Sequence, residues 1–136
     1  MGSNPAGWDL GLAELVCTEA GRRWPPLAKA PQPLRILETH SDIVTRLPPG
    51  AVLLASSALT PVEVYTVGER VLCLQGHPEM DNAMVAELIE KRSERGLLDA
   101  ELAAAGMASL RQLPHREFLE QWLRTFLREG RVPAAA

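Results

Sequence analysis

The chain has 136 residues, of which 46% are hydrophobic and 4% aromatic, and its formal net charge is −3 at pH 7. This length suits a single domain, here residues 1–136, and excludes a multidomain enzyme. The slight acidic excess gives no reason to expect binding to nucleic acid or to an anionic membrane surface. No stretch approaches the roughly 20 apolar residues of a membrane helix, and Met1–Pro5 lacks the apolar region of a signal peptide.

Short strands separated by turns are expected in the first two thirds of the chain. They are predicted at residues 8–16 (interrupted by Gly11), 34–38, 51–55 and 62–67. The Gly21–Pro33 segment holds four prolines and is predicted to be a loop without helices. Gly68 suits a hairpin turn. The following Val71–Leu74 run is continuously apolar, which predicts a central strand buried on both faces.

Helices are expected in the last third, where the apolar spacing changes. A first helix runs through Met80 and Ile89, with Asp81 or Asn82 as its cap, and ends at Gly96. A second is predicted from Asp99 to Leu110. A third is opened by Pro114 and closed by Gly130. We expect residues 131–136 to fray.

Two cysteines are too few for a disulfide framework. Cys17 and Cys73 both lie in apolar runs, which favours buried free thiols in a reducing compartment. The expected location is therefore the cytosol.

The sharpest local motif is Gln75-Gly76-His77-Pro78-Glu79, directly after the Val71–Leu74 run. Side chains two apart in extended backbone point to the same side, and Pro78 biases His77 towards extended geometry. The Glu79 carboxylate can therefore lie beside the His77 imidazole, set its tautomer and raise its basicity, as a general base requires. The alternative is a loop histidine beside a solvated glutamate.

A second polar group, Thr39-His40-Ser41-Asp42, follows another predicted strand. By itself it indicates a strand end at which Ser41 or Asp42 caps a short helical turn. His40 could also be grouped with His77 and Glu79 as a metal site, but the sequence has no strong zinc spacing. We expect neither a metal nor a cofactor.

Several motifs occur in a characteristic order along the chain. They are Gly7-Trp8-Asp9-Leu10-Gly11, Glu38-Thr39-His40-Ser41-Asp42, Leu47-Pro48-Pro49-Gly50-Ala51, Pro61-Val62-Glu63 and Cys73-Leu74-Gln75-Gly76-His77-Pro78-Glu79. In this order they resemble the C-terminal part of class I glutamine amidotransferase domains, especially plant γ-glutamyl peptidases and the amidotransferase domain of GMP synthetase. The resemblance covers roughly Asn4 to Gly130. It implies an α/β, flavodoxin-like fold that is incomplete at its N-terminus, with a mixed sheet followed by C-terminal helices.

The resemblance also implies chemistry, because that family hydrolyses glutamine amide or γ-glutamyl bonds with a Cys-His-Glu triad. His77 matches the catalytic histidine and Glu79 the carboxylate that orients it. The matched substrate region contains His40, Asp42, Gln75 and Gly76. The expected partner is a small γ-glutamyl substrate, glutamine or a γ-glutamyl peptide.

One departure from the family pattern puts enzyme activity in doubt. The family nucleophile lies in a Gly-x-Cys-x-Gly motif, and neither Cys17 nor Cys73 has such flanking glycines. The sequence therefore predicts a partial family member that is inactive alone, whether a truncated product, a split gene or a remnant. One alternative is a non-enzymatic remnant that pairs with a partner through an exposed sheet edge. In a partial family member, residues 34–38 and 71–74 are expected to be poorly covered by the rest of the chain. Another is an unrelated small α/β binding module.

Overall fold

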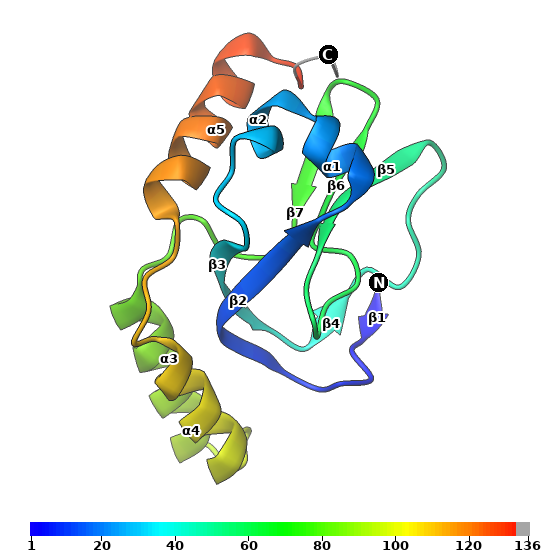
Figure 1. Cartoon of the computed structure of the whole chain (residues 1–136). Helices are drawn as coiled ribbons and strands as arrows, with labels where there is room; N and C mark the ends of the chain where they lie inside the picture. Colours follow the sequence, from blue (N-terminus) through cyan, green and yellow to red (C-terminus); the bar gives the residue numbers. More distant parts are fainter. Residues whose placement is uncertain (133–136) are drawn as a thin grey trace.

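A curled, five-stranded antiparallel sheet forms the centre of the computed structural model, which describes residues 1–132 (Figure 1). Its strand order is β3-β2-β5-β6-β7. The bounds are β2 (Asp9–Cys17), β3 (Leu34–His40), β5 (Ala51–Ser56), β6 (Val64–Val67) and β7 (Val71–Leu74). A separate antiparallel pair joins β1 (Gly2–Ser3) to β4 (Asp42–Ile43). These residues do not form the mixed sheet that the resemblance implied, because all their strand pairs are antiparallel. The longer helices all follow the last strand, so no such helix provides a crossover between parallel strands.

The proline-rich segment between β2 and β3 contains two short helices, α1 (Glu19–Arg23) and α2 (Pro25–Ala28), so the prediction of a loop at Gly21–Pro33 was wrong. The Thr18 side chain caps α1 by accepting a hydrogen bond from Gly21 N at 3.0 Å. Prolines occupy the first turn of α2, where the N–H that proline lacks has no partner within the helix. The prolines therefore begin a helix here rather than prevent one.

Local signals predicted the three later helices well. They are α3 (Asn82–Glu94), α4 (Ala100–Ser109) and α5 (Arg116–Glu129). Asp81 caps α3 by accepting from Met84 N at 2.9 Å, and Asp99 caps α4 in the same way. Gly130 ends α5 in the left-handed conformation, with φ of 66°. None of the helices within residues 1–132 has the length and apolar content needed to cross a membrane.

The segment just after α5 folds back onto the β6–β7 hairpin. Val132, which the sequence places in a frayed tail, is only 3% exposed and donates its backbone N–H to Glu69 O. Burial of this apolar side chain holds residue 132 against the main core. The rest of the predicted tail, 133–136, lies outside the described residues.

The structure places β7 at the edge of the sheet, so the prediction of a central strand buried on both faces was wrong. It pairs with β6 alone, and Val71 is 45% exposed. Leu72 and Leu74 pack against the core, which explains why the strand is apolar. A four-residue apolar run has no alternation to distinguish a strand covered on one face from one covered on both.

The opposite edge, β3, is covered, contrary to the expectation for residues 34–38. Leu34 and Leu37 are fully buried. The backbone edge is also satisfied, because His115 N donates to Arg35 O at 3.0 Å and His77 N donates to Leu37 O at 2.8 Å. Two segments from later in the sequence therefore protect this edge.

Two hydrophobic clusters hold the helices to the sheet. The larger one contains Trp24 and Trp122, whose rings meet edge to face with centroids 5.8 Å apart, and it lies under α5. The smaller one joins Leu10 and Leu37 of the sheet to helix residues that include Ile89. Figure 1 shows α3 and α4 as a helical hairpin at one end of the sheet, apart from α5.

Candidate active site

The His-Pro-Glu turn directly follows β7 and brings its two polar side chains together. His77 Nδ1 lies 2.8 Å from Glu79 Oε1, so the predicted contact forms, although Pro78 and Glu79 belong to a turn and not to the extended backbone that the prediction assumed. The His77 side chain is 30% exposed and that of Glu79 is 62% exposed. The pair is therefore hydrogen-bonded and open to a small molecule.

The Glu79 carboxylate determines which nitrogen of His77 faces outward. A carboxylate can only accept, so Nδ1 carries the proton and Nε2 of the neutral ring presents a lone pair. Partial burial opposes ionisation of Glu79. The hydrogen bonds from His77 and from its own backbone, together with the positive charge that the His77 ring carries when protonated, outweigh that burial and lower the pKa of Glu79. An ionised carboxylate behind an imidazole with a free Nε2 is the arrangement of a general base.

Backbone hydrogen bonds fix the turn to two other parts of the sheet. His77 N donates to Leu37 O, and Gln75 N donates to Glu63 O, both at 2.8 Å. Gly76 lies buried between these two anchors. A short local motif therefore depends on partners that are distant in the sequence.

The second predicted site group adopts a different local structure from the one expected. Asp42 belongs to β4 instead of capping a helical turn, because Ser3 and Asp42 pair in an antiparallel ladder. His40 Nδ1 lies 3.0 Å from the backbone carbonyl oxygen of Asp42. The Asp42 side chain is exposed and that of His40 is mostly buried.

Sequence reasoning missed a buried acidic cluster beneath the turn. Glu38 and Glu63 are 0% and 1% exposed, and Asp9 is also buried. Burial, followed by the negative charge of Asp9, raises the pKa of Glu38 to about 8. Burial, followed by the charge of Glu38, raises the pKa of Glu63 to about 9. Both glutamates lie within the motifs quoted for the resemblance, but only the curl of the sheet brings them together.

Neither cysteine shares a hydrogen bond with His77. Cys17 is buried in the main core, where its Sγ accepts from Gln32 Nε2 at 3.3 Å. Cys73 is half-buried on β7. Across residues 1–132, the one side-chain hydrogen bond of His77 goes to Glu79. No group of three or more His, Cys, Asp or Glu side chains in that same range has an arrangement that could hold a metal ion.

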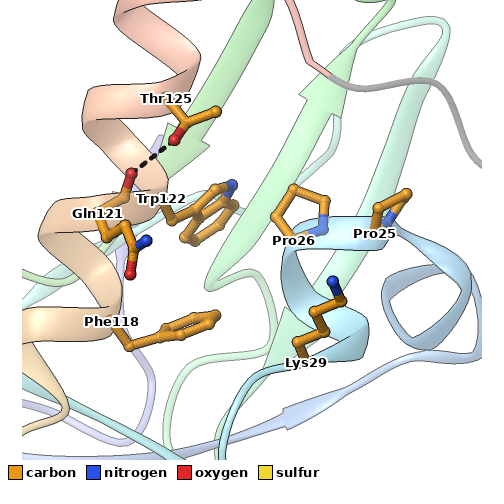
Figure 2. Close-up of a pocket in the computed structure, with 7 residues that line it drawn as sticks. All are labelled: Pro25, Pro26, Lys29, Phe118, Gln121, Trp122 and Thr125. Carbon is orange, nitrogen blue, oxygen red and sulfur yellow. Dashed lines mark hydrogen bonds between the residues drawn. The ribbon is translucent and has the colours of Figure 1, made fainter.

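Three pockets adjoin α5, and one of them is lined by residues of that helix alone. Another, of about 260 Å³, is lined by Glu79 and by residues of α5 that include Arg116 and Arg124. The third, of about 360 Å³, lies between α2 and α5, where Figure 2 shows Phe118 and Trp122 facing Pro26 and Lys29. Of these three, only the pocket lined by Glu79 contains residues of the His-Pro-Glu turn, so only that pocket is next to the candidate site.

Comparisons with known proteins agree with the sequence resemblance, although no family model matches the chain. It is 29% identical to γ-glutamyl peptidase 3 of Arabidopsis thaliana over 126 residues, which is 90% of this chain and 51% of that protein. It is 32% identical to γ-glutamyl peptidase 4 of the same plant, over 74% of this chain and 40% of that protein. The chain thus spans about half the length of these relatives, or less.

A solved structure shows the same fold. A glutamine amidotransferase from Thermotoga maritima superposes with a TM-score of 0.59 at 19% identity, over 94% of this chain and 53% of that one. The α/β amidotransferase fold predicted from the sequence is therefore confirmed for about half of such a domain. The chain is a homologue of γ-glutamyl peptidases and glutamine amidotransferase-like proteins, consistent with a class I glutamine amidotransferase-like protein.

Proposed function

We propose that this chain supplies the His-Glu half of a Cys-His-Glu active site that hydrolyses glutamine amide or γ-glutamyl bonds. The observation that carries the proposal is the 2.8 Å contact between His77 Nδ1 and Glu79 Oε1, which leaves Nε2 free. In this proposal the nucleophilic cysteine comes from a polypeptide segment outside residues 1–136.

In this mechanism His77 acts twice through Nε2. It first accepts the proton of the cysteine thiol, and the thiolate attacks the γ-carbonyl carbon of the substrate. The imidazolium then returns this proton to the leaving nitrogen, so that ammonia or an amine departs and a γ-glutamyl thioester remains. His77 next takes a proton from the water that attacks the thioester carbonyl, and it returns that proton to the cysteine sulfur as the C–S bond breaks and glutamate leaves. Glu79 holds the ring in the correct tautomer and stabilises the imidazolium throughout.

The proposed substrate is glutamine or a γ-glutamyl peptide; the names of the plant relatives indicate γ-glutamyl peptides for those proteins, and the name of the solved Thermotoga maritima protein indicates glutamine for that one. Gln75 and Gly76 lead directly into the His-Pro-Glu turn, whereas His40 is the last residue of β3 and Asp42 the first of β4. We assign these four residues to the substrate region. The free thiols of Cys17 and Cys73 support the cytosol as the proposed location.

The isolated chain is expected to release no ammonia or glutamate above background from glutamine or γ-glutamyl peptides. The reason is that the base has no thiolate to activate, so the covalent route is closed. Release is measured with the purified chain and with a Cys17→Ala, Cys73→Ala double variant. Turnover that vanishes in the double variant would show that one of these cysteines is the nucleophile and would overturn the proposal.

A second candidate function, pairing with a partner chain, is favoured by the free edge of β7. This strand has hydrogen-bonded neighbours on one side only, and Val71 projects from it at 45% exposure. An unpaired edge beside exposed apolar surface is a template for an added strand. This partner-binding role does not require catalysis.

We expect the chain alone to bind ANS and to form oligomers, and the separately expressed N-terminal half of a γ-glutamyl peptidase to suppress both. Size-exclusion chromatography and ANS fluorescence measure the effect. A Val71→Lys variant, which places a charge on the edge, serves as the matched comparison and should oligomerise less by itself. A monodisperse chain with no ANS signal and no response to the added half would contradict the edge-pairing role.

A further inference from the structure

The buried acids Glu38 and Glu63 form a contact between two parts of the sheet that are not paired strands. Glu38 lies in β3, whereas Glu63 directly precedes β6, and these strands are not neighbours in the sheet. Their buried carboxyl groups nevertheless lie close enough for each to affect the pKa of the other. Two ionised carboxylates would lack a donor between them, although the Ser57 hydroxyl is a hydrogen-bonding neighbour of Glu63. A proton held between them supplies that donor, because buried carboxyl groups must be protonated or paired.

The neighbours of the two carboxyl groups indicate which of them donates a proton to the other. The contact with Glu63 lowers the pKa of Glu38 and raises that of Glu63, which agrees with Glu63 as the donor. On the other side, Glu38 Oε2 lies 2.9 Å from His40 Nε2. His40 Nδ1 faces the carbonyl oxygen of Asp42, which can only accept, so Nδ1 is itself a donor. One proton therefore lies between Glu38 and His40, and the chain of contacts runs from Glu63 to Asp42.

The same acid pair supports the turn that carries the candidate base. Gly76 packs directly on Glu38: a Cβ atom at this position would overlap Glu38 Oε1 and would lie 2.9 Å from Ile36 Cδ1. The residues on either side of Gly76 are bonded to the backbone of Glu63 and of Leu37, the residue before Glu38. The carboxyl pair thus lies between the two anchors of the turn and joins them.

We propose that Glu38 and Glu63 are positioning residues for His77: their shared proton joins β3 to the segment before β6 and so fixes the turn that directs the His77 imidazole at Glu79. The inference rests on the proposed function for its catalytic meaning, because it concerns the same His-Glu pair. It assigns a role to two acids that are too deeply buried to contact a substrate.

The test is the tautomer of His77, read from imidazole ¹⁵N chemical shifts in the full chain and assigned with a His77→Gln variant. The wild-type ring should carry its proton on Nδ1. Glu38→Ala should lose this signature and give the tautomer mixture of an unrestrained imidazole. Glu38→Gln should restore it, because the amide can accept from Glu63 and donate to His40 Nε2. Val132→Ala, beside Glu69 at the other end of the β6–β7 hairpin from the His-Pro-Glu turn, should lower the melting temperature and leave the His77 signal unchanged.

Three outcomes would overturn the inference. One is a folded Glu38→Ala chain that keeps the wild-type His77 signal. Another is a Glu38→Gln chain that loses the signal as completely as Glu38→Ala. The third applies if Glu38→Ala does not fold. Gly76→Ala then serves as the variant, because it displaces the turn without removing a carboxyl group. An unchanged His77 signal in Gly76→Ala would overturn the inference.

If neither variant folds, the wild-type chain provides the test at high pH. When Glu38, Glu63 and the adjacent Asp9 are all ionised, the His77 ring should no longer carry its proton on Nδ1 alone. His40 is the other titratable neighbour of the pair. An unchanged His77 tautomer under those conditions would refute the inference. None of these readouts requires turnover. The positioning role and the proposed function can therefore fail separately.

Discussion

When the chain is completed by the nucleophile-bearing half of a γ-glutamyl peptidase, Glu79→Gln is expected to lower turnover by roughly 10³- to 10⁴-fold. The glutamine amide can donate to His77 Nδ1, which would move the ring proton to Nε2 and remove the lone pair that acts as base. The change preserves the size of the side chain at a position that is 62% exposed. Folding and association should therefore be nearly unaffected.

The measurement is glutamate release from a γ-glutamyl peptide by the mixed halves, with kcat and KM determined separately. We expect the loss in kcat, because the missing proton transfer belongs to the chemical step. Glu90→Gln, at an exposed position of α3, is the matched control and should retain full activity. Equal rates for the two variants would remove Glu79 from the mechanism. A mixture with no turnover in the wild type would count against the proposed function itself.

The chain should be most stable at mildly acidic pH and should lose stability as the pH rises towards 9. The folded pKa values of Glu38 and Glu63, about 8 and about 9, lie above the ordinary glutamate pKa of 4.5. Between pH 4.5 and these folded pKa values, the unfolded chain has released the two glutamate protons that the folded chain still holds. The free energy of unfolding therefore falls with pH by about 1.4 kcal/mol per unit for each group. The stability that these protons contribute is fully present below the unfolded pKa and is lost as the pH passes through the folded values.

Urea unfolding at pH 5, 7 and 9 measures this slope. A Glu38→Gln, Glu63→Gln double variant keeps the hydrogen bonds without titrating, so its midpoint should vary much less over this range and should exceed that of the wild type at pH 9. The groups facing the pair, Asp9 from β2 and His40 at the end of β3, remain in both proteins. Parallel pH profiles for the two proteins would show that the acids do not hold protons in the folded chain.

Features determined by neighbouring residues could be predicted from the sequence. Asp81 and Asp99 accept hydrogen bonds from amides three residues ahead, and Gly130 takes the positive φ of a helix end, so each signal lies within a few residues of its effect. The contact between His77 and Glu79 is local in the same way.

Features that depend on distant partners could not be predicted. The position of β7 at the edge follows from the strand order, to which the Val71–Leu74 run contains no clue. The two short helices of the proline-rich segment depend on packing, since Leu27 and Trp24 belong to the main core. The pairing of Glu38 with Glu63 requires the whole sheet to curl, and neither residue alone differs from an ordinary surface glutamate in the sequence.

The backbone hydrogen bonds that anchor the His-Pro-Glu turn also have a consequence for folding. His77 N reaches Leu37 O and Gln75 N reaches Glu63 O, and the first bond closes a long stretch of chain. Bringing such distant segments together has an entropic cost that is recovered only when the intervening strands have paired. We therefore expect the candidate base to acquire its orientation late in folding, after the β5–β6–β7 meander, whose contacts are mostly local. A partly folded chain would already contain that meander and would still lack a directed His77.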